Sequence, residues 1–251
     1  LVFPLGSILT NGQTIVLARN RSAFLGAFPG VPVFNTFPTT LTATQLLMLT
    51  RTISNVVQTV DAVRFDRSAP WVVAAAGQSM QLIDAAQDNG RAANWTVSTL
   101  VPVTPGVSNS VSYALPPFDP IWINEIQHVS LAGLVDNFGE PSPWIEIYNA
   151  GLVPVSLTNY FLAQDFATNL TQWPFPPDAT LAAGEHKVIW ADGEPAQDTA
   201  GDWHTSFVLG RHGRLALTRL TNGVPQVVDH LAWRWLGANV TLGSHPEGQL
   251  L

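Results

Sequence analysis

The chain carries the stretch Leu215-Ala216-Leu217-Thr218-Arg219, and an earlier stretch, Leu47-Met48-Leu49-Thr50-Arg51, closely resembles it. A second match has the same spacing, because Val60-Asp61 recurs as Val228-Asp229 (219 − 51 = 168 and 229 − 61 = 168). Two matches at one common offset indicate an internal repeat. The sequence is therefore predicted to contain two copies of one module.

Each copy of the stretch is predicted to form a β-hairpin. Turn-forming residues follow it, Ser54-Asn55 in the first copy and Thr221-Asn222-Gly223 in the second. Asn and Gly favour the tight turns that join antiparallel strands. The strands are expected at residues 46–51 and 56–65, and again at 215–219 and 227–233.

The repeat extends upstream, but the two copies differ at their ends. Phe3-Pro4 and Gly12 match Phe175-Pro176 and Gly184 at another common offset (175 − 3 = 172 and 184 − 12 = 172). The first copy lacks opening strands and the second lacks a closing segment, so the chain is expected to be a piece of a longer protein. We expect two domains: residues 1–115, a partial β-sandwich of later strands that ends in a proline-rich linker, and residues 116–251, a nearly complete one.

The rest of the sequence favours an all-β fold, since no segment shows sustained helical periodicity. One short helix is expected near residues 22–25. Further strands are expected at residues 12–18, 80–83, 121–129, 144–149, 160–164 and 187–191. Many short strands at near-regular spacing are typical of β-sandwiches.

Composition excludes several classes of function. The 251 residues include no cysteine, so disulfides and thiolate sites are absent, and a net charge of −7 with one lysine, Lys187, makes nucleic acid an unlikely partner. No apolar run reaches the roughly 18 residues that span a bilayer, so no membrane insertion is expected. Only 12% of the residues are charged, which is typical of secreted or surface β proteins. We expect an exported, bacterial, extracellular or cell-surface protein.

The second copy resembles the lamin tail domain, a family found in nuclear lamins and in large bacterial surface or secreted proteins. The matching stretches are Ile123–Ile126, Trp144–Gly151, Val155–Leu157, Tyr160–Leu162, Trp173–Pro177, Leu181–Gly184, Val188–Ala191, Val228-Asp229 and Pro246–Gly248. The first copy matches only the later half of the family pattern, up to Thr104–Asn109. The resemblance implies two tandem immunoglobulin-like β-sandwiches, the first without its N-terminal strands.

The resemblance also implies a role without catalysis, because such modules serve as interaction or spacer units. We therefore expect a structural and protein-interaction module of a large secreted or cell-surface protein. The incomplete first copy is expected to gain its opening strands by complementation, from another chain or from a preceding segment, with other protein chains or copies of itself as partners. The alternative is an accessory carbohydrate-binding module of a secreted polysaccharide-degrading enzyme, with polysaccharide as partner.

No catalytic site is predicted. Glu125 and Glu146 lie on neighbouring strands, as in a glycosidase pair, but hydrogen bonding within the strands explains them better. Gly77-Gln78-Ser79-Met80-Gln81 lacks the last glycine of a nucleophile elbow. The histidines show no metal-binding spacing, although His204 and His212 could converge if their loop folds back. The chain is expected not to be an enzyme and to need no cofactor.

Two acidic loops are weak candidates for calcium, which prefers oxygen ligands. They supply Asp136, Asn137, Glu140, Asp192 and Glu194. Neither loop follows the twelve-position calcium pattern, and acidic residues are common in turns.

Tryptophans are the candidates for a binding surface, because an exposed indole can stack on a sugar ring. Trp203, Trp233 and Trp235 are weak glycan or interface candidates, and Trp233 and Trp235 are expected to point to the same side of one strand. Exposure and alignment of Trp71, Trp95 and these three would favour carbohydrate binding.

Overall fold

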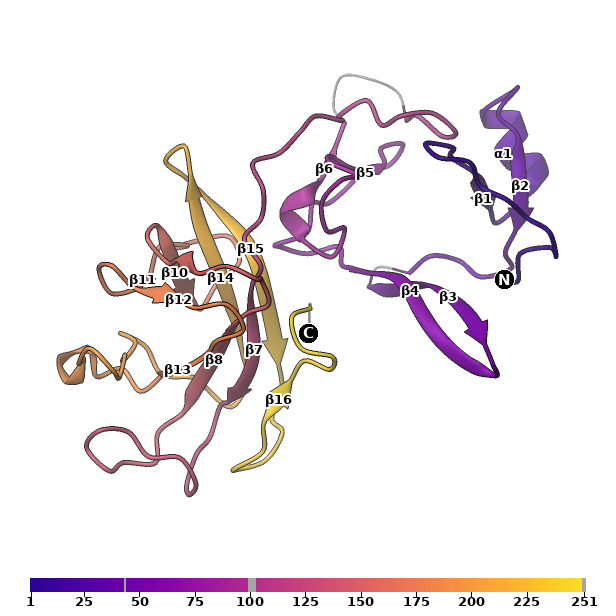
Figure 1. Cartoon of the computed structure of the whole chain (residues 1–251). Helices are drawn as coiled ribbons and strands as arrows, with labels where there is room; N and C mark the ends of the chain where they lie inside the picture. Colours follow the sequence, from indigo (N-terminus) through magenta and orange to yellow (C-terminus); the bar gives the residue numbers. More distant parts are fainter. Residues whose placement is uncertain (43, 99–102, 250–251) are drawn as a thin grey trace. The chain divides into compact units, whose positions relative to one another are not determined.

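The computed structural model describes residues 1–42, 44–98 and 103–249. Within these ranges the regular secondary structure is almost entirely β, which confirms the predicted fold class, and the one α-helix is α1 (Arg21–Ala27). The described helices are all too short or too polar to cross a membrane. The chain divides into two compact units, one of residues 1–89 and 94–115 and one of residues 90–93 and 116–251 (Figure 1).

The second unit is built from two four-stranded sheets. The first sheet has the order β13 (His186–Trp190), β8 (Trp144–Asn149), β7 (Ile121–Gln127), β16 (Leu242–Gly243). The second has the order β11 (Trp173–Pro174), β10 (Tyr160–Ala163), β14 (Gly213–Thr221), β15 (Val224–Trp233). A short pair, β9 (Val155–Ser156) with β12 (Thr180–Leu181), and a 3₁₀ turn, η2 (Pro195–Gln197), complete the unit.

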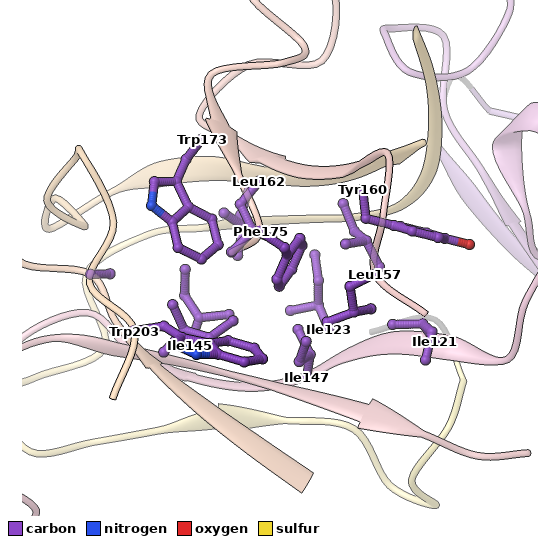
Figure 2. Packing of buried hydrophobic residues seen from close by; sticks show 14 of the residues in the cluster. Ile121, Ile123, Ile145, Ile147, Leu157, Tyr160, Leu162, Trp173, Phe175 and Trp203 are labelled. Atoms are coloured by element: carbon purple, nitrogen blue, oxygen red, sulfur yellow. The ribbon is translucent and has the colours of Figure 1, made fainter. Parts of the chain in front are cut away.

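The core of the second unit draws residues from both sheets (Figure 2). In β8, Ile145 and Ile147 alternate with more exposed residues, as the two-residue period of a strand requires. In β7 the buried isoleucines shift from Ile121 and Ile123 to Ile126, because a bulge lies between Ile123 and Glu125. The extra residue at the bulge shifts the alternation, so that Ile126, three residues after Ile123, again faces the core.

Asp229 joins β15 of the second sheet to β7 of the first sheet. This residue of β15 is buried, and its Oδ2 accepts a hydrogen bond of 2.8 Å from the backbone N–H of Ile123 in β7. Its Oδ1 accepts another from the N–H of His230. A carboxylate that accepts backbone N–H groups inside the protein satisfies donors that would otherwise be costly to bury. The repeated Val-Asp pair therefore needs a β7-type strand beside it.

The first unit contains three two-stranded sheets in its described residues. They are the parallel pair β1 (Val16–Ala18) with β2 (Val33–Thr36), the hairpin β3 (Gln45–Ile53) with β4 (Val56–Phe65), and the antiparallel pair β5 (Met80–Leu82) with β6 (Trp95–Val97). The predicted short helix is α1, whose first turn is capped by the side chain of Asn20. The predicted strand at 12–18 is shorter, since β1 begins at Val16. A 3₁₀ turn, η1 (Ala92–Asn94), precedes β6.

The hairpins β3–β4 and β14–β15 correspond residue by residue. Their bounds differ by one offset (213 − 45 = 168 and 233 − 65 = 168). Each has a register shift at the same place, between Leu49 and Thr50 and between Leu217 and Thr218. The predicted repeat of this hairpin is thus present in the backbone.

Both hairpins turn in the way that the sequence predicts. Ser54 and Asn55 have φ of 51° and 64°, and Asn222 and Gly223 have φ of 53° and 78°. Two consecutive residues with positive φ are required by the type I′ turn, which matches the twist of antiparallel strands. Asn and Gly adopt this conformation at low cost, and Ser54 is held there by the hairpin.

Tyr160 connects β10 to the segment that precedes β7. Its hydroxyl donates a hydrogen bond of 2.6 Å to Asp119, and the ring is buried near Leu157 (Figure 2). Burial, followed by the bond to Asp119, raises the pKa of the Tyr160 hydroxyl well above its ordinary value of 10.0. The folded unit therefore favours the neutral hydroxyl of Tyr160 over the phenolate.

The raised pKa of Tyr160 predicts a loss of stability in alkali. The stabilisation is complete below pH 10 and decreases as pH rises from 10 toward the folded-state pKa, because the unfolded chain then loses the proton more readily. Tyr160→Phe should cost about 1 kcal/mol at neutral pH and should flatten the decline above pH 10. Urea unfolding between pH 7 and 11 measures this, with Tyr148→Phe as the control. An unchanged alkaline slope in Tyr160→Phe would contradict the prediction.

Candidate functional site

Two loops of the second unit bring three ionisable side chains together. Asp136 comes from the loop between β7 and β8, and Asp192 and His204 come from the segment that follows β13. Each offers a ligand atom within 4.8 Å of the other two. We call these three residues the loop cluster.

Asp136 is held by its own loop. Its Oδ1 accepts hydrogen bonds from the N–H groups of Phe138 and Glu140, at 2.8 and 3.0 Å. The turn is closed by Gly139, which has φ of 82° and donates its N–H to the carbonyl of Asp136. Asp136 is only 6% exposed, and its Oδ2 has no hydrogen-bond partner among the described residues. One carboxylate oxygen is thus fixed by the backbone while the other remains available.

His204 lies at the centre of the loop cluster and is fully buried. Its Nδ1 is 2.7 Å from Oδ2 of Asp192, and its Nε2 is 2.9 Å from Oδ1 of Asn137. The backbone fixes the ring, because the N–H of His204 donates to Asp198 and its carbonyl accepts from the indole of Trp173. An isolated bridge between the backbones of His204 and Trp190 brings this residue beside the end of β13.

Four of the five predicted calcium candidates take part in this region, but in different ways. Asp136 and Asp192 belong to the loop cluster, and Asn137 bonds to His204. Glu140 contributes its backbone N–H to Asp136, and its side chain is exposed. Glu194 instead accepts a hydrogen bond of 2.6 Å from Gln197. His204 was not among these candidates. The sequence left open a convergence of His204 with His212, but His212 is exposed and is not part of the cluster.

A scan against protein families matches residues 116–234 to the Lamin Tail Domain family. Residues 116–234 form a lamin tail domain. The predicted resemblance is thereby confirmed over β7 to β15, and all three residues of the loop cluster lie in the matched segment. A search of curated proteins finds no match to the chain.

The tryptophans of the lamin tail domain are mostly core residues. Trp203 and Trp233 are 7% and 5% exposed and belong to the hydrophobic cluster, so their selection as surface candidates is wrong. Trp235 is 49% exposed, and the guanidinium of Arg211 lies 5.0 Å from its ring. Trp71 is also buried. The five tryptophans considered for sugar binding therefore do not form an exposed row.

Two glutamates of the lamin tail domain lie opposite each other on the first sheet. Glu125 in β7 pairs in register with Glu146 in β8. Glu146 accepts a hydrogen bond of 2.9 Å from the side-chain amide of Asn124. This contact agrees with the structural role expected from the strand pattern. The family is an immunoglobulin-like structural one that is not typically catalytic.

Proposed function

We propose that this chain is a structural and protein-interaction module of an extracellular or cell-surface protein, and that its first unit is completed by a strand from another protein chain. The observation that carries this proposal is the exposure of the β3–β4 hairpin. An uncovered apolar hairpin is a template for strand addition.

Exposure differs sharply between equivalent residues of the two hairpins. Leu217 is 0% exposed and its equivalent Leu49 is 45% exposed, while Val228 is 4% exposed and Val60 is 54% exposed. The difference arises because β14 pairs with β10 in the second unit, whereas β3 pairs only with β4 among the described strands. The first hairpin thus has the sequence of a core hairpin without the sheet that covers it.

Asp61 supports the same conclusion. Its equivalent, Asp229, is buried and accepts the N–H of Ile123 in β7. Asp61 is exposed and accepts hydrogen bonds of 2.9 and 3.1 Å from the amide of Asn89. A carboxylate at this position suits a β7-type strand, so the first hairpin has the polar group as well as the apolar face for lamin-tail strands.

The register of β10 defines the chemistry of the missing strand. Leu162 of β10 lies opposite Leu217, and Tyr160 lies opposite Arg219. By the common offset, the corresponding positions of the first hairpin are Leu49 and Arg51. We therefore propose an extended segment with the alternation of Tyr160–Ala163, supplied by another chain.

The extracellular location is part of the proposal and is supported by composition. A cysteine-free β chain with 12% charged residues is typical of exported bacterial surface proteins. Strand addition suits such proteins because backbone hydrogen bonds and side-chain pockets together give a stable, directional contact.

A labelled peptide of residues 158–165 tests the strand contact. We expect saturable binding to the full chain, measured by fluorescence anisotropy, and no binding by the same peptide with Leu162→Lys. Leu49→Lys in the chain should weaken binding at least tenfold, because a charge would face the new core. Val224→Lys is the matched control, since Val224 is 65% exposed on the complete hairpin.

Two outcomes would overturn the proposed strand contact. One is a chain that does not bind the peptide, and the other is binding that survives Leu49→Lys unchanged. Light scattering across a dilution series distinguishes the two possible strand donors, another protein and a second copy of this chain. If the chain stays a monomer and binds the peptide, the donor is another protein. If the chain assembles with itself and the peptide does not inhibit this assembly, the contact is not made at the β3–β4 hairpin, and the proposal is contradicted.

A further inference from the structure

We propose that the loop cluster of the lamin tail domain, Asp136, Asp192 and His204, binds one divalent transition-metal ion of the zinc type. This proposal is independent of the strand contact at the first unit. It rests on the free oxygen of Asp136, the tautomer that Asn137 imposes on His204, and the mixed nitrogen and oxygen ligands.

The first argument is the buried oxygen of Asp136. Burying a carboxylate oxygen without a partner is costly, and buried polar atoms in proteins are nearly always paired. Oδ2 of Asp136 has no partner among the described residues, although Oδ1 has two. A cation bound by Oδ2 would provide the missing interaction.

The second argument is the orientation of Asn137. Its amide nitrogen donates to the carbonyl of Gln197 at 3.2 Å, so its Oδ1 is the atom that faces His204. An amide oxygen can only accept, and Nε2 of His204 must therefore carry hydrogen. This arrangement is the usual outer-shell contact of a histidine ligand, whose second nitrogen donates to an oxygen.

The third argument concerns Nδ1 of His204. With hydrogen on Nε2, a neutral ring directs the lone pair of Nδ1 at Oδ2 of Asp192, only 2.7 Å away. Two lone pairs at this distance repel each other, so a proton or a cation must lie between them. A metal ion satisfies this requirement and the free oxygen of Asp136 together, whereas a proton satisfies only the first.

The spacing of the cluster suits a small ion after a modest rearrangement. Ligand atoms bonded to tetrahedral zinc at about 2.0–2.2 Å lie about 3.3 Å apart. The ligand atoms of the loop cluster lie within 4.8 Å of one another, so the wider separations would have to shorten, whereas the pair of His204 and Asp192, at 2.7 Å, would have to open slightly. Three protein ligands would leave a fourth position for water.

The ligand types select the class of ion. Calcium prefers six to eight oxygen ligands, whereas an imidazole nitrogen suits zinc and its first-row neighbours. The loop cluster offers one nitrogen and two carboxylates and is buried, which does not suit calcium. The loops that were only weak candidates for calcium are thus assigned in this proposal to a zinc-type ion.

Binding would connect two loops at one end of the lamin tail domain. Asp136 is on the loop before β8, and Asp192 and His204 are on the segment after β13. Neither loop contributes a long strand, so a shared ion would restrict both. The expected consequence is a higher melting temperature and slower proteolysis of residues 129–143 when metal is present.

Calorimetric titration with zinc of the full chain, freed of metal by chelator, tests the site. We expect one zinc ion per chain with micromolar or tighter affinity, little competition from millimolar calcium, and a visible absorption band when cobalt replaces zinc. Asp136→Asn should lower the affinity at least tenfold, because it keeps Oδ1 as an acceptor but removes the charge at Oδ2. Asp192→Asn is a second variant, in case the first does not fold.

His186→Gln is the matched control. Nε2 of His186 lies 3.4 Å from a carboxylate oxygen of Glu247 at the surface, so this pair would account for adventitious binding. The control should bind zinc like the original chain. The proposal is overturned if the chain binds no zinc, if calcium displaces zinc readily, or if binding is lost in His186→Gln and kept in Asp136→Asn and Asp192→Asn.

Discussion

Leu217→Ala should lower the free energy of unfolding by about 3–4 kcal/mol, whereas Leu49→Ala, at the equivalent position, should change it by less than about 0.5 kcal/mol. Leu217 is 0% exposed in a core formed by both sheets, so truncation removes buried surface and leaves a cavity. Leu49 is 45% exposed, and its removal leaves no cavity. Identical substitutions in equivalent hairpins thus measure how complete each module is.

Urea unfolding of the full chain, followed by tryptophan fluorescence, measures this difference. Nine tryptophans report on the transition, and the buried Trp173 and Trp203 belong to the core around Leu217. Equal losses in the two variants would contradict the prediction, because Leu49 would then be as buried as Leu217. A further outcome links this test to the proposed strand contact: with bound strand peptide, Leu49→Ala should become destabilising.

The hairpins were predictable because several independent features of the sequence indicate them. Apolar alternation, turn residues and the repeat all place β14 and β15, and the positive φ of Asn222 and Gly223 follows from residue chemistry. The bulge at Leu217 and Thr218 was not predicted, because one extra residue in a strand leaves no mark in composition. The strand alternation after Ile123 was hidden for the same reason.

The loop cluster was only partly predictable. Acidic turns at Asp136 and Asp192 are visible as local patterns, and both were selected as candidates. His204 lies in an irregular segment, and backbone pairing with the end of β13, including the bridges Trp190–His204 and Asp192–Val208, brings it to Asp192. Such long-range pairing in a loop has no periodic signal. The burial of Trp203 was missed for a similar reason, since an indole looks the same in a sequence whether it packs inside or outside.

Arg91 illustrates a contact that sequence reasoning missed entirely. It lies in residues 90–93, which belong to the second unit, although the residues before and after them in the sequence belong to the first unit. It is only 2% exposed, and its guanidinium donates to the carbonyls of Ile121, Val228 and Asp119. Ile121 belongs to β7 and Val228 to β15, so Arg91 joins the same two strands as Asp229.

Arg91→Met should destabilise the second unit by about 3 kcal/mol. The guanidinium lies 3.4 Å from the ring centre of Trp122, so the substitution removes a desolvated cation–π contact as well as charged hydrogen bonds. Methionine fills similar volume but leaves the carbonyls of Ile121 and Val228 without this donor. The cost should therefore come from polar groups rather than from a cavity.

Two further variants separate charge from geometry at this position. Arg91→Lys keeps the charge but cannot present the planar fork that reaches several carbonyls, so it should recover less than half of the loss. Arg214→Met is the control. Arg214 is exposed and its guanidinium lies 5.6 Å from the Phe166 ring centre, farther than Arg91 from Trp122, so this substitution should cost little stability. If Arg91→Met unfolds at the same urea concentration as the original chain, residues 90–93 do not close the edge of the second unit. If it is destabilised as expected, a lamin tail domain in this chain includes four residues from outside its family match, and its stability must be measured with them present.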